Sequence, residues 1–181
     1  MPLWLKHAPD RELGDSSPVS SATIKQVYNS PPQDGNGNPV KTSHHSKEVN
    51  MVSLADARRV IAAAEKKAAE IGQPMNIAVA DGGGNIVAHV RMDGAWIGSI
   101  DISMKKAYTS RAFDIATKDL AAHSQSGGQF FGIHASNDGK IMIFAGGIPL
   151  KKDGKVVGSI GVSGGSGEQD HAVAAAGAAA F

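Results

Sequence analysis

Two tight-turn motifs, each lying between short apolar runs, constrain the fold of this sequence more than any other feature. The turns are Asp81-Gly82-Gly83-Gly84-Asn85 and Asp153-Gly154, and the runs beside them are 75–80, 86–92, 148–151 and 156–163. Glycine-rich and Asp-Gly turns between such runs are typical of β-hairpins. Since a hairpin pairs neighbouring strands antiparallel, the sequence predicts an antiparallel sheet, not a parallel sheet of the dinucleotide-binding kind.

Alternation along the strand 86–92 predicts which side chains share a face of this sheet. We expect one face to hold Ile86, Ala88, Val90 and Met92, and the other to hold Val87, His89 and Arg91. A further apolar run, 141–145, predicts a fifth strand.

Four segments predict helices that pack on the sheet. They are 53–71, 96–113, 117–123 and a last helix from Ser166 toward Phe181, with Ser53, Thr117 and Ser166 as N-caps. In the helix Trp96–Phe113, we expect the apolar residues at three- and four-residue spacing to form one stripe: Trp96, Ile100, Met104, Ala107 and Tyr108. The order α-β-β-α-α-β-β-β-α indicates an α+β fold with a five-stranded antiparallel sheet.

Residues 1–50 predict an arm that precedes a domain at 51–181. Six of the eight prolines fall before Val40, and the segment lacks a sustained apolar period. Its apolar residues Leu3, Trp4 and Leu5 are candidates for clasping a neighbouring subunit.

Composition excludes several classes of function. With 18 Lys and Arg against 17 Asp and Glu, the chain has no electrostatic footprint for nucleic acid or an anionic membrane. The absence of cysteine excludes disulfides, zinc-thiolate sites, iron–sulfur clusters and thiol nucleophiles. The first residues turn polar too soon for a signal peptide and no run approaches a membrane span, so we expect a soluble protein, cytoplasmic by default.

Several segments, in this order, resemble the GlcG-like family, which includes HbpS-like haem-binding proteins and the C-terminal domain of PduO-type corrinoid adenosyltransferases. They are Asp81–Gly84, Arg91–Ala95, Lys106-Ala107-Tyr108-Thr109, Gly146–Pro149, Ile160–Gly165 and Glu168–Asp170. The resemblance implies a profilin-like fold, a homo-oligomer and, in haem-binding members, a haem beside the Lys-Ala-x-Thr helix. It also implies that Thr109 matches the threonine whose hydroxyl approaches the iron.

Asp101, Lys105 and Thr109 follow one another at four-residue spacing on that helix, so a carboxylate, an ammonium and a hydroxyl share a face. The residues alone favour an exposed ion pair, whereas the resemblance favours ligand contact for Lys105 and Thr109. Tyr108 is a further candidate for reaching haem iron, as is Met104 unless it belongs to the core.

Two other positions are candidates for holding the carboxylates of an acidic ligand. Gly164 and Gly165 precede the last helix, where free N–H groups attract anions, although the glycines can equally serve a sharp strand-to-helix turn. Arg91 can bind a carboxylate through two hydrogen bonds, while Asp81 and Asp93 are expected to cap backbone N–H groups.

The case for metal binding or classical catalysis is thin. Glu168 and His171 have a spacing that suits a metal, but acidic residues in a first helical turn are explained by the helix dipole. No nucleophile elbow or zinc-protease motif is present. Three hypotheses follow: a haem-binding protein that senses, carries or degrades haem; an enzyme acting on a small acidic or corrinoid-related metabolite in the same pocket; and a ligand-free oligomeric accessory protein.

Overall fold

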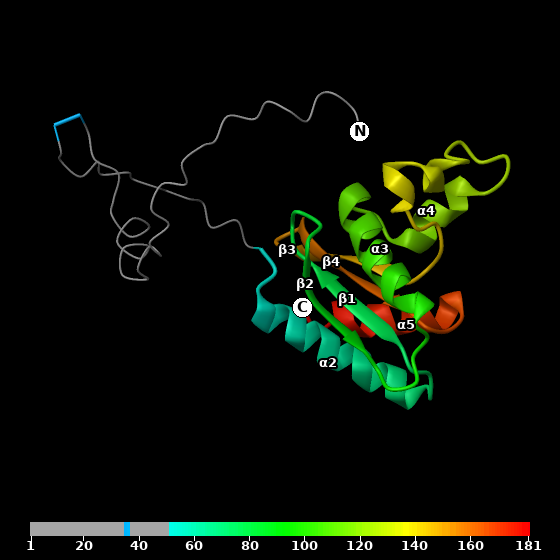
Figure 1. The fold of residues 1–181 in the computed structure, drawn as a ribbon, viewed down its shortest axis with the longest axis horizontal. Coiled ribbons are helices and arrows are strands. Elements are labelled where there is room, and N and C mark those ends of the chain that lie inside the picture. Colours follow the sequence, from blue (N-terminus) through cyan, green and yellow to red (C-terminus); the bar gives the residue numbers. More distant parts are fainter. Residues whose placement is uncertain (1–34, 37–50) are drawn as a thin grey trace, which may run out of the picture. The chain divides into compact units, whose positions relative to one another are not determined.

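The computed structural model describes residues 35–36 and 51–181 (Figure 1). The chain divides into the units 1–47 and 48–181, and all helices and strands of the described residues lie in the second unit. The arm predicted for residues 1–50 falls outside the described residues, apart from a turn at Gly35 and Asn36.

Four strands form one antiparallel sheet in the described part of the chain. They are β1 (Asn76–Ala80), β2 (Ile86–Arg91), β3 (Gly147–Lys152) and β4 (Lys155–Ser163), arranged in the order β2-β1-β4-β3. Both predicted hairpins are present, because β1 pairs with β2 and β3 pairs with β4. The hairpins join through an antiparallel β1–β4 pair at the centre of the sheet.

The fifth strand predicted at 141–145 is absent from the structure. Ile141 is buried, but the backbone of this segment pairs with no strand. The Met142 N–H instead donates to the Thr109 hydroxyl, 2.9 Å away. The apolar content of the segment therefore reflects packing against a helix and not sheet formation.

Helices cover both faces of the sheet (Figure 1). Helices α2 (Leu54–Glu70) and α5 (Gly167–Ala178) pack together on one face, and α3 (Gly98–Phe113) lies on the other. The main hydrophobic core fills the space between the sheet and the α2–α5 layer. It includes Val60, Ile77, Val79, Ile160 and Val173.

The short helix α4 (Thr117–Ser124) follows α3, and the 3-10 turns η2 (Ile133–Ala135) and η3 (Asn137–Gly139) lead on toward β3. The prediction that Thr117 caps α4 is wrong, because the N-cap is Ala116. The Thr117 hydroxyl instead accepts a hydrogen bond from the Gly147 N–H at 2.8 Å and so ties α4 to the start of β3.

The face of α3 that packs on the sheet consists mainly of small and polar residues. Of the predicted apolar stripe, Ala107 and Met104 do pack on the sheet. The buried residues of α3 are Ser99, Ser103, Lys106, Ala107, Thr109 and Ser110, whereas Trp96 precedes the helix and is 64% exposed. The cause lies in β4, where a Cβ on Gly161 would overlap the backbone of Ser103 and Ala107. A helix this close to a sheet accommodates only small side chains at the contact.

A bulge in β2 reverses the predicted position of Ile86. Val79 pairs with Ala88 and Ala80 pairs with Ile86, with a register shift between the two pairs. Because Val79 and Ala80 point to opposite faces, Ile86 and Ala88 do so as well. Ile86 therefore lies on the α3 face of the sheet, not with Ala88 and Val90.

Candidate functional site

An open cavity lies between α3 and the β1–β2 hairpin, and we call it the α3 cavity. Its lining residues are Gly83, Gly84, Asn85, Ile86, Asp101, Met104, Lys105, Tyr108 and Lys140, and its volume is about 320 Å³. This site forms where the larger apolar side chains of α3 lie beside the bulge in β2. Met104 packs against Ala78 and Ala80 at the edge of the contact with the sheet and also lines the cavity, and the bulge brings Ile86 to the same side.

The charged groups of the α3 cavity leave one positive charge in excess. Lys105 pairs with Asp101 at 2.8 Å, so the ion pair expected from their spacing is present. The Lys140 ammonium lies 5.8 Å from the centre of the Tyr108 ring, within the range of a cation–π contact. The cavity thus combines apolar surface with cations near its rim, an arrangement that suits an apolar ligand with an acidic edge.

Thr109 does not line the α3 cavity. Its side chain is fully buried, and its hydroxyl lies 2.8 Å from the Lys105 carbonyl and 3.2 Å from the Lys140 carbonyl, besides accepting from Met142. The donor and acceptor of this hydroxyl are therefore already engaged in the protein. The expectation that Thr109 presents a hydroxyl to a bound iron stays a prediction, and its fulfilment would require the hydroxyl to give up one of these partners.

Gly164 and Gly165 are not a vacant anion seat. Their N–H groups donate to the same oxygen of Asp170, over 3.1 and 2.9 Å. The chain thus supplies its own carboxylate to this turn. Arg91 is exposed at the far end of β2 from Ile86, roughly 16 Å along the strand, and does not line the α3 cavity.

Sequence reasoning missed a buried ion pair beside this turn. The Lys106 ammonium lies 2.6 Å from Asp170 and 2.9 Å from the Val162 carbonyl, and the two charged side chains are 0% and 3% exposed. Burial lowers the pKa of Lys106, and the Asp170 carboxylate opposes that shift. The pair joins the middle of α3 to the start of α5. The sequence signal for this pair was the position of Lys106 on the same helix face as several serines, a face that the structure buries.

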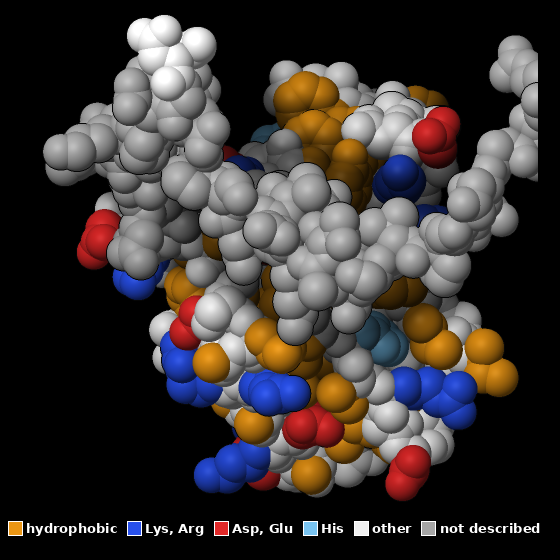
Figure 2. Space-filling view, turned by 60° about the vertical axis from the view of Figure 1, so that its left-hand side comes forward, with side chains coloured by type: hydrophobic (Ala, Val, Ile, Leu, Met, Phe, Trp, Pro, Cys, Tyr) orange, Lys and Arg blue, Asp and Glu red, His pale blue; other side chains and the backbone are white. Residues whose placement is uncertain are grey.

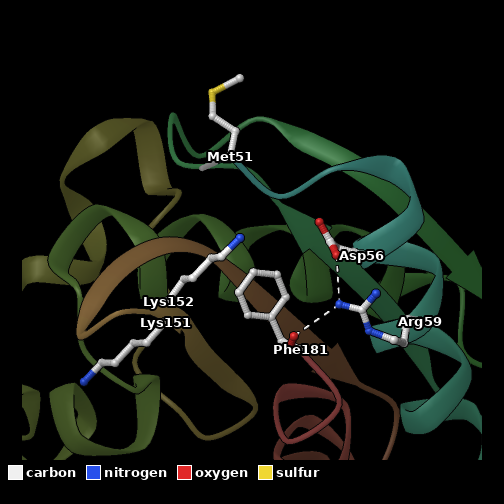
Figure 3. A pocket seen from close by; sticks show the side chains of 6 residues that line it. All are labelled: Met51, Asp56, Arg59, Lys151, Lys152 and Phe181. Carbon is white, nitrogen blue, oxygen red and sulfur yellow. Dashed lines mark hydrogen bonds and ion pairs between the residues drawn. The ribbon is translucent and has the colours of Figure 1, made fainter. Parts of the chain in front are cut away.

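A smaller cavity of about 140 Å³ lies near the start of α2 and the end of α5 (Figure 3). Its lining residues are Met51, Asp56, Arg59, Lys151, Lys152 and Phe181. The Arg59 guanidinium bonds to Asp56 at 2.8 Å and to the Phe181 carbonyl at 3.1 Å, so it already has acceptors within the protein. We therefore place the candidate ligand site in the α3 cavity.

No group of side chains that could hold a metal ion is found among residues 35–36 and 51–181. In the described residues, no three side chains of His, Cys, Asp or Glu lie close enough together to bind one metal ion. Glu168, a possible metal ligand by its spacing from His171, instead accepts a hydrogen bond from the Ser166 hydroxyl. None of the described helices has the length and apolar character to cross a membrane. On the face seen in Figure 2, basic and acidic side chains are interspersed with hydrophobic ones.

Family comparison agrees with the fold and the ordered motifs. Residues 52–179 match the family described as haem degrading protein HbpS-like. The chain therefore belongs to the HbpS-like family.

Individual relatives extend this assignment. An uncharacterized 15.0 kDa protein of Citrobacter freundii is 40% identical over 129 residues, which are 71% of this chain and 91% of that protein. The corrinoid adenosyltransferase PduO of Salmonella typhimurium is 35% identical over 132 residues, 72% of this chain but only 39% of that enzyme.

Solved structures share the fold. Protein ORFY of Klebsiella pneumoniae superposes with a TM-score of 0.71 at 37% identity, covering 72% of this chain and 90% of ORFY. A complex of PduOC with haem superposes with a TM-score of 0.69 at 33% identity, covering 71% of this chain and 94% of PduOC. Haem binding is thus a property found within this family.

Proposed function

We propose that this protein binds haem in the α3 cavity. The observation that carries the proposal is the cavity itself, in which Ile86, Met104 and Tyr108 offer apolar surface beside Lys105 and Lys140. A haem-bound relative with the same fold supports this choice of ligand.

The residues of the α3 cavity fit the chemistry of a haem. Tyrosine oxygen and methionine sulfur are both known donors to haem iron, which makes Tyr108 and Met104 the candidate ligands. Lys105 and Lys140 are suited to the propionates. The volume of about 320 Å³ is at the lower end of ligand sites and the cavity is open, so one edge of a flat ligand stays in water.

Such a site suits a haem that is exchanged and not held permanently. A bound haem would supply redox chemistry, including reaction with peroxide or oxygen. The part of the protein is to cover one face of the macrocycle through Met104 and Ile86 and to neutralise its acidic edge. Sensing, trafficking or degradation of haem are the roles consistent with an open site.

Titration of the purified protein with haemin tests the proposal. We expect a shifted Soret band that saturates at a defined stoichiometry. Met104→Glu should weaken binding at least about tenfold, because it places a carboxylate against the macrocycle. Arg91→Gln, outside the α3 cavity, is the matched control and should bind as the parent does.

A spectrum indistinguishable from that of free haemin would contradict the proposal. Cobalamin and small carboxylic acids belong in the same panel, read by thermal shift. If one of them stabilises the protein and haemin does not, the α3 cavity serves a corrinoid-related or acidic metabolite.

We infer further that the chain self-associates through the segment before α3. Trp96 and Ile97 are adjacent and are 64% and 74% exposed. Large apolar side chains exposed side by side are typical of protein contacts. The proposed occupant of this surface is a second copy of the chain, as the resemblance to the family implies.

A further inference from the structure

A second hollow lies directly beside the α3 cavity, and we call it the Arg111 hollow. Its lining residues are Gly82, Gly83, Gly84, Tyr108, Arg111 and Ala112, and its volume is about 270 Å³. Gly83, Gly84 and Tyr108 line both spaces, so the two are neighbouring compartments along one face of α3. The α3 cavity carries the apolar side chains, whereas the Arg111 hollow is walled by glycine backbone and a guanidinium.

The Arg111 side chain has one donor without an acceptor in the described part of the chain. Its Nη1 lies 2.6 Å from Asp114, but its Nε is shielded from water and lacks a hydrogen-bond partner within the described part of the chain. A buried donor left without an acceptor is destabilising. The Arg111 side chain as a whole is 26% exposed and lines the hollow, so a ligand there can supply an acceptor to its guanidinium.

Competing charges around the Arg111 hollow are few. Arg111 is the single charged residue that lines it in the described structure. The nearby carboxylate of Asp114 is already paired with Arg111 Nη1. One oxygen of the nearby Asp81 accepts the N–H groups of Gly83 and Asn85 at 2.8 and 2.9 Å and so braces the turn.

Glycine keeps this compartment open. A Cβ on Gly84 would lie 3.4 Å from the Tyr108 ring, and its φ of +78° is one that favours glycine. The turn therefore comes close to the ring without side-chain atoms filling the space between the turn and α3.

We propose that the Arg111 hollow is a carboxylate subsite for the ligand of the α3 cavity. This inference rests on the proposed function and deepens it: the apolar body of the ligand lies against Met104 and Ile86, and a carboxylate reaches past Tyr108 to Arg111. Guanidinium groups bind carboxylates through two parallel hydrogen bonds, which gives both affinity and orientation. The recognised class is a flat apolar molecule with at least one flexible acidic arm.

Haemin and haemin dimethyl ester, which lacks the free carboxylates, separate this subsite from general affinity for the macrocycle. The parent protein should bind haemin about tenfold more tightly than the ester. Arg111→Gln should reduce that advantage, with ester binding unchanged, while Lys105 and Lys140 retain the part that they contribute. Arg91→Gln is the control for removing an exposed arginine and should keep the full advantage.

Asp114→Asn is the second variant, since it breaks the Arg111–Asp114 pair at the end of α3 but retains the guanidinium. If Asp114→Asn keeps the preference for haemin over the ester, the result supports the subsite. If Asp114→Asn loses that preference as Arg111→Gln does, the Arg111–Asp114 pair is what matters, and the inference of a carboxylate subsite is overturned. Parental haemin binding by Arg111→Gln, or equal loss of haemin and ester, also overturns the inference. Failure of the parent protein to bind haemin overturns the proposed function itself.

Discussion

Thr109 uses its hydroxyl to hold residues 140–142 against α3. Removing that hydroxyl leaves the partly buried Met142 N–H without its acceptor. We expect Thr109→Val to lower the free energy of unfolding by about 1–3 kcal/mol, measured by urea denaturation. Haemin binding should persist, because Thr109 does not line the α3 cavity.

Thr109→Ser, which keeps a hydroxyl, is the matched control and should recover most of the stability. A Thr109→Val protein that is as stable as the parent but has lost its Soret shift would show that this threonine is an iron ligand, as the resemblance implied.

The buried pair Lys106–Asp170 gives a prediction about charge. Lys106→Met leaves the Asp170 carboxylate buried without its cation, and we expect a loss of about 3–5 kcal/mol in unfolding free energy. The double variant Lys106→Met/Asp170→Asn removes both charges and should be more stable than the single variant. If the double variant is the less stable of the two, the pair contributes through its hydrogen bonds to Gly164 and Gly165 more than through its charge.

At the scale of elements, the N-cap of α2 affects the pKa of a carboxyl group, because Ser53 caps the helix and hydrogen-bonds to Asp56. Hydrogen bonds from the Ser53 hydroxyl and N–H, with a smaller contribution from Arg59, lower the pKa of Asp56 from 3.8 to about 2. Because the folded pKa is the lower one, the stabilisation is complete above about pH 4 and is lost as pH falls toward 2.

Ser53→Ala should therefore raise the pKa of Asp56 toward 3.8 and cost about 1 kcal/mol at neutral pH. The measurements are an NMR titration of the Asp56 carboxyl and urea denaturation. Ser126→Ala, on an exposed loop, serves as the control. An Asp56 pKa unaltered by Ser53→Ala would show that the Ser53 N–H and Arg59, which the substitution leaves in place, dominate.

The close contact between α3 and β4 depends on Gly161. Gly161→Ala should push the helix from the sheet and destabilise the protein by about 1–3 kcal/mol, seen as a lower melting temperature. Gly98, the first residue of α3, meets no atom within 4 Å of an added Cβ, so Gly98→Ala should be neutral or slightly stabilising. Equal melting temperatures for the two variants would contradict the role of Gly161.

Local chemistry in the sequence was sufficient to predict the hairpins, the antiparallel sheet and the positions of the helices. The orientation of α3 was not predictable in this way, because periodicity marks Trp96, Met104 and Tyr108 as apolar without saying what their partner surface is. The small residues Ala78, Ala80 and Gly161 of the opposing strands decide it, and they meet α3 only in the folded chain. The β2 bulge is equally a tertiary feature.

The candidate site residues also divide into those that local sequence could indicate and those that depend on tertiary contacts. Lys105 and Tyr108 line the α3 cavity, while their part in binding a ligand, which the resemblance implies, stays a prediction. Gly164, Gly165 and Thr109 carried plausible local signals, yet Asp170 and the backbone of residues 140–142 already use their hydrogen-bonding groups. Side chains distant in sequence compete for the same groups as a ligand, and that competition cannot be predicted from spacing alone.

At the scale of the whole molecule, the two faces of the sheet serve different purposes. The α2–α5 face holds the large aliphatic core, which supplies most of the buried apolar surface. The α3 face packs through small residues and leaves its larger apolar side chains for the α3 cavity and for the Trp96–Ile97 surface. Substitutions on the two faces should therefore separate stability from binding.

The Trp96–Ile97 surface provides a test of whether residues outside the main core affect binding without affecting stability. Trp96→Ser combined with Ile97→Ser removes exposed apolar side chains, so we expect a smaller assembly by analytical ultracentrifugation with little change in the free energy of unfolding per chain. Phe131→Ser, at a side chain that is 65% exposed, is the matched control and should leave the mass unchanged. An assembly that persists in the double variant would place the subunit contact elsewhere. A parent protein that sediments as a monomer at all concentrations would remove self-association from the function of this chain.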